Sequence, residues 1–366
     1  MRTIIIIPSI FLVAILHSCT DNQTDVQYQR WTLTDTVFTS RPDHPMDNVA
    51  VKDPSIVNYN GRYHLFYTAK SVSDSGSGPV YSIGCGYASA PTPKGLNSAE
   101  RVNMDSLAGR DVVAPQVFFY EPQKLWYLIA HTTVVEGELH TLEPIYLTNP
   151  DIEDPGGWSE AQILETGKSS DEFWIDFWVI CTDETAYLFY ANQKGSILRM
   201  ECGLEDFPSG FADSTPEEAL NVNHMEDEKP WRMFEAVHIY HVKEDGTYLA
   251  LLEGAFSNPE RHYDVESRTR FIFGMRADSL NGRWSRVENG VTEFLADAGN
   301  LYNEDGSKSA YTQVSHPELI RSGYNQKLEI DDYNLSLLFQ SFDGTKIPDS
   351  YHYNELPWEL ILMKNY

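Results

Sequence analysis

A repeated pair of short strand patterns constrains the fold of this chain more than any other feature. Each unit contains two largely apolar runs that are separated by a polar turn, a pattern typical of a β-hairpin. The units open at Asp53, Ala114, Asp176, Glu235 and His316. They recur about every 60 residues, with a longer last interval, which suits a four-stranded propeller blade.

Five such units predict an all-β fold, a five-bladed β-propeller with a central axial pocket, over residues 31–366. The segments 255–270 and 296–310 lengthen the last interval, and we expect them to be insertions on one face. In the first unit, Asn60-Gly61 predicts a tight hairpin turn, because both residue types accept a positive φ. The alternative is a β-sandwich in which the regular spacing is fortuitous.

Three of the five opening residues are acidic: Asp53, Asp176 and Glu235. The first strand of each propeller blade lines the central axis, so we expect these carboxyl groups to meet at one mouth of the channel. Burial and like charge would then raise the pKa of at least one of them. Three carboxylates can instead bind calcium, but the Asp-x-Asp-x-Asp-Gly loop of common calcium sites is absent around them.

Carboxyl pairs across a pocket are typical of glycoside hydrolases. One carboxylate activates water or attacks the sugar, and the other carries the proton that the leaving oxygen takes. A third carboxyl group can favour the protonated state of the acid through like-charge repulsion. The sequence therefore favours a hydrolase acting on a glycan.

The motifs around these acids resemble those of glycoside hydrolase family 62, over roughly residues 30–364. The likeness is carried in order by the segments 51–64, 114–120, 174–176, 233–237, 277–284, 315–321 and 353–357. The resemblance implies a five-bladed propeller and an α-L-arabinofuranosidase that removes side chains from arabinoxylan or a related plant cell-wall polysaccharide. The same clan contains family 43.

The resemblance also implies roles for single residues. It makes Asp53 the general base, Asp176 the acid that orients groups and modulates their pKa, and Glu235 the general acid of an inverting reaction. It makes Lys52 a contact to the furanose ring. His316 would be an axial residue that helps hold a calcium ion, with water in most of the coordination sphere, or simply a buried, hydrogen-bonded histidine.

Several residues depart from the family pattern. Phe177 stands where the family commonly has Gln, and Phe339 replaces a Tyr of the last blade. The segment 131–133 replaces a Trp, and Pro317 replaces the Gly after the axial His. Together with Lys52 and His316, we predict Trp174, Phe177 and Phe339 as substrate-binding residues.

These departures leave the three acids in place but alter their surroundings. They leave open a polysaccharide backbone other than xylan. Two alternatives for the whole chain also remain: a family 43-type exo-glycosidase on another pentose glycan, and a non-catalytic surface glycan-binding lipoprotein.

The first residues predict export and a lipid anchor. Arg2 precedes an apolar run over residues 4–16, and Cys19 follows Leu-His-Ser, which resembles a lipoprotein signal. We expect a signal peptide over 1–18, lipidation of Cys19 and a tether over 19–30. The protein would then be a bacterial lipoprotein at the outer membrane, the cell surface or in the periplasm. An ordinary cleaved signal is the alternative.

Charge and cysteine content exclude other classes. A net charge of −27 without a basic patch argues against nucleic-acid binding. Cys85, Cys181 and Cys202 form at most one disulfide, and Cys181 lies in an apolar run typical of a core residue. Zinc-type Cys and His spacing is absent, and no organic cofactor is expected. We expect a monomer that contacts the membrane only through its anchor.

Overall fold

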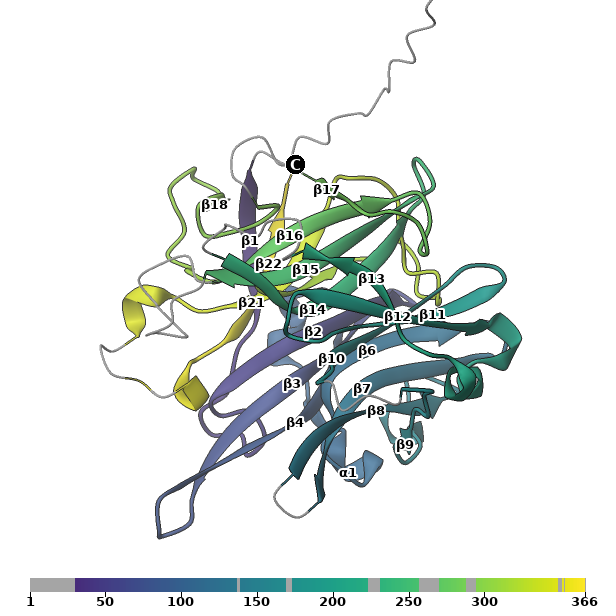
Figure 1. Cartoon of the computed structure of the whole chain (residues 1–366). Coiled ribbons are helices and arrows are strands. Elements are labelled where there is room, and N and C mark those ends of the chain that lie inside the picture. Colours follow the sequence, from purple (N-terminus) through teal and green to yellow (C-terminus); the bar gives the residue numbers. More distant parts are fainter. Residues whose placement is uncertain are drawn as a thin grey trace, which may run out of the picture.

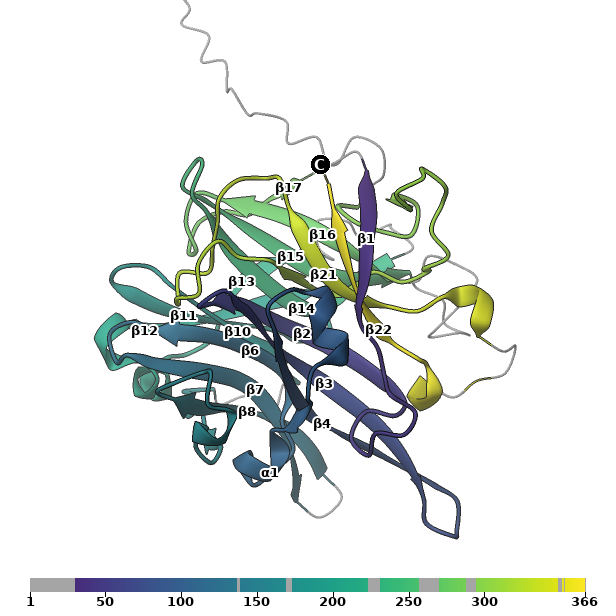
Figure 2. The ribbon, with the colours of Figure 1, turned by 180° about the vertical axis from the view of Figure 1, so that it is seen from behind.

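The computed structural model describes residues 30–365 except 137–138, 169–172, 223–230, 257–269, 288–293, 348–350 and 352. Five β-sheets surround a common axis, as Figures 1 and 2 show from opposite sides. This arrangement confirms the predicted five-bladed propeller and rules out the β-sandwich. The predicted signal peptide, Cys19 and the tether up to residue 29 lie outside the described residues.

The first three blades each have four antiparallel strands in sequence order. The first blade contains β2 (Ala50–Tyr59), β3 (Arg62–Asp74), β4 (Pro79–Ala90) and β5 (Val102–Asn103). The second contains β6 (Val113–Tyr120), β7 (Leu125–Glu136), β8 (Leu139–Asn149) and β9 (Gln162–Ile163). The third contains β10 (Ile175–Cys181), β11 (Thr185–Ala191), β12 (Ser196–Gly203) and β13 (Glu217–Asn221).

The last two blades each gain a fifth strand. The fourth contains β14 (Trp231–Val242), β15 (Thr247–Phe256), β16 (Arg270–Ala277), β17 (Ser285–Val287) and the parallel β20 (Glu329–Ile330). The fifth contains β19 (Ser315–Leu319), β21 (Ser336–Ser341), β22 (Glu359–Lys364), β1 (Trp31–Phe38) and β18 (Leu301–Tyr302). Helical segments are short: η1 (Lys94–Ser98), α1 (Asp105–Ala108), η2 (Pro155–Gly157), η3 (Leu204–Asp206), η4 (Ser209–Asp213), η5 (Gly344–Lys346) and η6 (Tyr353–Glu355).

Both ends of the chain complete the fifth blade. Strand β1 pairs antiparallel with β22, from Thr32 opposite Lys364 to Phe38 opposite Leu360. Trp31 is fully buried, and its indole N–H donates to the carbonyl of Leu295 at 2.8 Å. This closure joins the two ends by hydrogen bonds, so the ring of blades cannot open without breaking a strand pair.

Each innermost strand begins with the same local distortion. A β-bulge interrupts the pairing of β2, β6, β10, β14 and β19 near their starts. One residue of each bulge has a positive φ, between 46° and 58°: Asp53, Ala114, Asp176, Ala236 and His316. A bulge turns a side chain out of the regular alternation, which here aims it at the axis.

This pattern corrects the predicted repeat at one position. In the fourth blade the residue with positive φ is Ala236, at 52°, and Glu235 precedes it. Glu235 is therefore equivalent to Lys52 of the first blade and Ile175 of the third, rather than to Asp53 and Asp176. The sequence repeat aligned Glu235 with Asp53 and Asp176, one residue out of register. An apolar run follows Glu235 and Ala236 alike, so the pattern did not distinguish the two positions.

Buried polar groups connect the blades along the axis. Glu318 is fully buried and accepts hydrogen bonds from the Ile56 N–H at 3.1 Å and the Tyr240 O–H at 2.7 Å. The Arg321 guanidinium donates to the carbonyls of Ile56 and Val117, both at 2.9 Å. Since an unmet polar group in the interior is costly, each blade depends on its neighbours for correct placement.

The remaining sequence expectations on this part of the chain also have outcomes. Asn60 and Gly61 both have a positive φ, as predicted for the hairpin turn. Cys85 and Cys181 are buried, and both are free thiols, as is Cys202. Cys181 is a core residue, as predicted.

Among the described residues, no helix is long and apolar enough to cross a membrane.

Candidate active site

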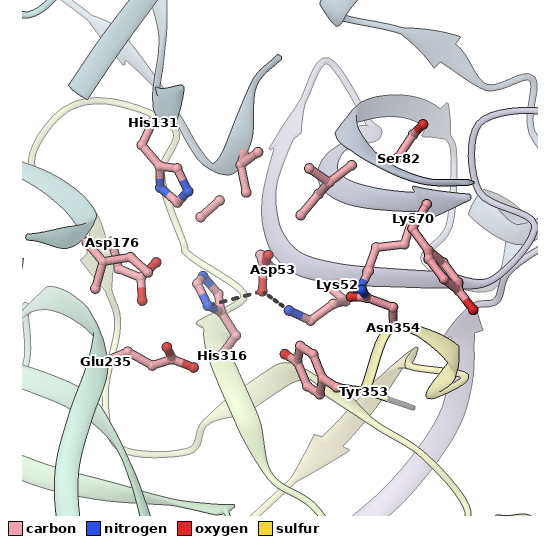
Figure 3. Close-up of a pocket in the computed structure, with 15 residues that line it drawn as sticks. Lys52, Asp53, Lys70, Ser82, His131, Asp176, Glu235, His316, Tyr353 and Asn354 are labelled. Atoms are coloured by element: carbon pink, nitrogen blue, oxygen red, sulfur yellow. Dashed lines mark hydrogen bonds and ion pairs between the residues drawn. The ribbon is translucent and has the colours of Figure 1, made fainter. Parts of the chain in front are cut away.

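A cavity of about 370 Å³ lies at one mouth of the propeller axis. The starts of the innermost strands line it, and they bring Asp53, Asp176 and Glu235 together, as predicted. Figure 3 shows Asp53 in the middle of the cavity, with Asp176 and Glu235 on one side of it. Lys52 and His316, the other two polar residues predicted here, also line the cavity.

Asp53 is held as a carboxylate. Its Oδ1 lies 3.6 Å from the Lys52 ammonium and 3.4 Å from Nδ1 of His316. Burial raises the pKa of Asp53, but the charges of Lys52 and His316 and a hydrogen bond from Thr68 outweigh burial and lower it to about 2. Burial lowers the pKa of Lys52, and the charge of Asp53 reverses this, so the pair stays ionised.

Asp176 has the opposite electrostatic surroundings. It is 7% exposed, and its Oδ2 accepts a hydrogen bond from the Ala236 N–H at 2.8 Å. Burial and then the nearby charges of Glu235 and Asp53 raise its pKa well above the usual range. The hydrogen bond to Ala236 also fixes Asp176 next to Glu235, because Ala236 directly follows Glu235 in β14.

Glu235 is held by an arginine that the sequence analysis missed. Arg270 donates to Glu235 Oε1 at 2.9 Å and to Glu253 Oε1 at 2.5 Å, so two carboxylates share one guanidinium charge. Glu253 is fully buried, and burial raises its pKa to about 7. Its Oε2 accepts the backbone N–H of His316 at 2.7 Å. The sequence signal for Glu253 is that a charged residue directly follows the apolar run Leu249–Leu252.

Two buried histidines complete the central part of the cavity. Burial lowers the pKa of His131 to about 4 and that of His316 to about 3, so both imidazoles are neutral at neutral pH. His131 belongs to the segment 131–133, which departs from the family pattern. It brings a hydrogen-bonding ring to the cavity that the sequence analysis did not assign.

The far wall is formed by Lys70 on β3 and by Tyr353 and Asn354 in η6. The Lys70 ammonium donates to Asn354 Oδ1 at 2.7 Å and lies 4.9 Å from the centre of the Tyr353 ring. Lys70 went unassigned in the sequence analysis because it lies at the far end of the strand that follows the first-blade motif.

The glycosyl hydrolase family 62 model matches residues 30–363. The chain belongs to glycosyl hydrolase family 62. The resemblance found in the sequence is thereby confirmed over nearly its whole predicted extent.

Known relatives agree with this membership. The chain is 31% identical over 337 residues to α-L-arabinofuranosidase C of Cellvibrio japonicus, covering 92% of this chain and 47% of the relative. It thus spans about half the length of that curated protein. The catalytic domain of a family 62 α-L-arabinofuranosidase from Coprinopsis cinerea superposes with a TM-score of 0.72 at 27% identity, covering 92% of this chain and 98% of that domain.

A third similar structure is a family 62 hydrolase solved in complex with xylotriose. It has a TM-score of 0.71 at 26% identity and covers 92% of this chain and 97% of that one. An α-L-arabinofuranosidase from Lactobacillus brevis has a TM-score of 0.56 at 14% identity, which indicates a shared fold and no more.

Two residues predicted to contact substrate lie in the core instead. Phe177 is 2% exposed and Phe339 is fully buried, and neither lines the cavity. The next residue along β21, Gln340, faces the axis and accepts the Asp53 N–H at 2.7 Å. Side chains alternate along a strand, so Phe339 points the other way. The lost hydroxyl at position 339 therefore removes nothing from this cavity.

Trp174 also lies outside the cavity lining. It is 7% exposed and packs edge-on against Phe177 and Tyr190, at ring-centre distances of 4.9 and 5.4 Å. Its indole N–H donates to the carbonyl of Leu142 at 2.5 Å. These contacts make Trp174 a support for the start of β10, where Asp176 lies.

The described side chains do not by themselves form a calcium site. Among them, no group of three or more His, Cys, Asp and Glu residues is placed to hold a metal ion. Within the described part of the chain, His316 Nδ1 lies 3.4 Å from the Asp53 carboxylate, whereas calcium takes six to eight oxygen ligands. An ion at His316 would take most of its ligands from water.

Proposed function

We propose that this chain is an inverting α-L-arabinofuranosidase that removes arabinofuranose side chains from a xylan-type polysaccharide. The observation that carries the proposal is the pairing of an ionised Asp53 with the Asp176 and Glu235 carboxyl groups in one cavity. Membership of family 62 and the arabinofuranosidase and xylotriose-bound relatives support the substrate class. The family 43-type and non-catalytic alternatives are not favoured.

Asp53 is the general base. Its lowered pKa keeps it ionised at neutral pH, which is the state that accepts a proton from water. The activated water attacks the anomeric carbon on the face opposite the leaving oxygen. Lys52 holds the carboxylate in place and donates to the sugar.

Glu235 is the general acid, and its proton goes to the glycosidic oxygen as the bond to the anomeric carbon breaks. Burial and the nearby charges of Glu235 and Asp53 raise the pKa of Asp176, so this neighbour of Glu235 holds a proton on the same side of the cavity. Arg270 fixes the Glu235 carboxyl group through the 2.9 Å contact. Attack from the opposite face inverts the configuration, so an α-linked arabinofuranoside gives the β-sugar first.

Product analysis tests this proposal. The protein is incubated with arabinoxylan, arabinan and arabinogalactan, and NMR follows the first-formed anomer. We expect β-arabinofuranose from arabinoxylan and none from a Glu235→Gln variant whose circular dichroism matches the wild type. Release of the α-anomer would contradict the roles of Asp53 and Glu235. Release of no sugar from any of the three would overturn the enzyme assignment.

We also propose that Cys19 is lipidated. The lipid would anchor the enzyme at the outer membrane, the cell surface or in the periplasm, and a Cys19→Ala variant should then leave the membrane fraction.

We propose in addition that one calcium ion binds at His316. It should appear as one equivalent of metal in the dialysed protein. A monomer of the propeller domain is expected in size-exclusion chromatography with light scattering.

A further inference from the structure

The cavity contains a second cation, Lys70, that the proposed reaction does not use. Lys70 is 6% exposed and lines the cavity together with Lys52. Lys52 is occupied, since its ammonium lies 3.6 Å from the Asp53 carboxylate. Figure 3 shows Lys52 and Lys70 on one side of Asp53, with Asp176 and Glu235 on the other. One wall of the cavity therefore carries the lysines, and the opposite wall carries the acidic residues.

The Lys70 ammonium has capacity for a ligand. An ammonium group has three N–H donors. One donates to Asn354 Oδ1 at 2.7 Å, and the group lies 4.9 Å from the Tyr353 ring centre, where the ring face attracts it. Asn354 and Tyr353 are both uncharged, so neither neutralises the positive charge of Lys70.

The balance of charges around Lys70 favours an added anion. Burial and the repulsion of Lys52 lower the pKa of Lys70 to about 8, while Asp53 acts in the opposite direction. The charge of Asp53 is already paired with that of Lys52, at 3.6 Å. A carboxylate placed beside Lys70 would relieve both the burial of the ammonium and its repulsion by Lys52.

We propose that Lys70 is a specificity-determining residue that binds the carboxylate of an acidic sugar substituent, a uronate, on the same glycan that carries the arabinofuranose. The inference rests on the proposed function and adds a second recognised group to the substrate. The chain as a whole carries a net charge of −27 and repels anions. A cation inside the cavity is what allows an acidic substrate to bind in spite of that repulsion.

The experiment compares two substrates that differ only in charge. One is an arabinosylated, uronate-bearing oligosaccharide, and the other is the same compound with its carboxyl group reduced to an alcohol. We expect kcat/KM of the wild type to be about tenfold higher for the acidic form, the usual size of a charge-assisted hydrogen bond. Lys70→Gln should lose about tenfold on the acidic form and only about twofold on the reduced form.

Control variants separate charge from structure. Lys94→Gln removes the same charge at an exposed lysine that pairs with Asp35 at 3.2 Å, outside the cavity, and should keep the wild-type ratio. Lys70→Arg keeps the positive charge and should retain most of the preference for the acidic form. Binding of both oligosaccharides to Glu235→Gln, measured by calorimetry, should show the same preference without turnover.

The outcomes are distinct. Equal kcat/KM for both substrates in the wild type overturns the inference, and this comparison requires no variant to fold. Equal losses on both substrates in Lys70→Gln also overturn it, because Lys70 would then only hold Asn354. Failure to release arabinose from either substrate contradicts the proposed function instead, while the calorimetric preference still decides the role of Lys70.

Discussion

Asp53 and Asp176 occupy the same position in two blades and have opposite chemistry. Both are the positive-φ residue of the bulge that opens an innermost strand, at 46° and 58°, and they are 5% and 7% exposed. Yet the pKa of Asp53 falls to about 2, and that of Asp176 rises well above its usual range. The repeat therefore determines where a carboxyl group lies, and its neighbours determine whether that group is ionised.

The difference comes from the position before each acid. That position holds Lys52 in the first blade and Ile175 in the third, so only Asp53 receives a cation from its own strand. In the fourth blade the same position holds Glu235, and the following Ala236 N–H donates to the Asp176 carboxyl group at 2.8 Å. One position of the repeat thus supplies a positive charge to Asp53 and a negative charge to Asp176.

Replacing Asp53 and Asp176 each by asparagine should lower kcat to different extents, because the two acids have different roles. Asp53→Asn removes the group that accepts the proton from water, and we expect kcat to fall about 10³-fold or more. Asp176→Asn removes only an influence on Glu235, so a loss of about 10²-fold is expected. Initial rates of arabinose release from arabinoxylan measure both values. Equal losses would mean that the two positions do not have separate functions.

The pH dependence should respond to Lys52. The base must be ionised, and the pKa of Asp53, about 2, places the acid limb of kcat/KM far below neutral pH. In Lys52→Met the charge that lowers this pKa is gone, so the acid limb should move to higher pH by about one to two units. Rates from pH 2 to 8 on a small aryl arabinofuranoside measure the shift. An unchanged acid limb would show that Lys52 does not control Asp53.

The same two amides should change stability in opposite directions. Because the folded pKa of Asp53 is lowered, its ionisation stabilises the fold above about pH 4, and this is lost as the pH falls through about 2. Asp53→Asn also leaves Lys52 buried without its carboxylate, so a loss of about 3 kcal/mol at pH 7 is expected.

Asp176 has a raised pKa, so its contribution is complete at low pH and is lost as the pH rises towards that pKa. Asp176→Asn should therefore raise the free energy of unfolding at pH 7, by about 1 kcal/mol. Urea unfolding of both variants at pH 5 and pH 7 tests the signs. A destabilised Asp176→Asn protein would contradict the electrostatic account of this site.

Sequence reasoning located the blades and the three acids because hydrophobic periodicity repeats with each blade. It placed Glu235 one residue out of register, because an apolar run does not show which residue before it has a positive φ. It also missed Glu253 and Arg270, which lie on β15 and β16, the second and third strands of the fourth blade, and contact Glu235 only once the sheet is assembled.

The burial of Phe177 and Phe339 was missed for a related reason. A resemblance matches positions along the chain, whereas the face that a side chain occupies depends on the local bulge and on strand alternation. The pairing of β1 with β22 was equally inaccessible, because Trp31–Phe38 carries none of the repeated motif.

The smallest expected effect concerns the second blade, where the repeated position carries no acid. Ala114 has φ of 51°, and its N–H donates to Thr68 Oγ1 at 2.9 Å, so the distortion persists without any carboxyl group. Glycine adopts this φ without the steric cost that alanine bears, although it loses more entropy on folding. Ala114→Gly should therefore change the free energy of unfolding by less than about 1 kcal/mol, in the stabilising direction, with kcat unaltered. Thermal and urea unfolding measure the change, and Ala130→Gly, in the middle of β7, is the matched control that should destabilise. If Ala114→Gly destabilises as much as that control does, the positive φ is not the strained element that the five blades share.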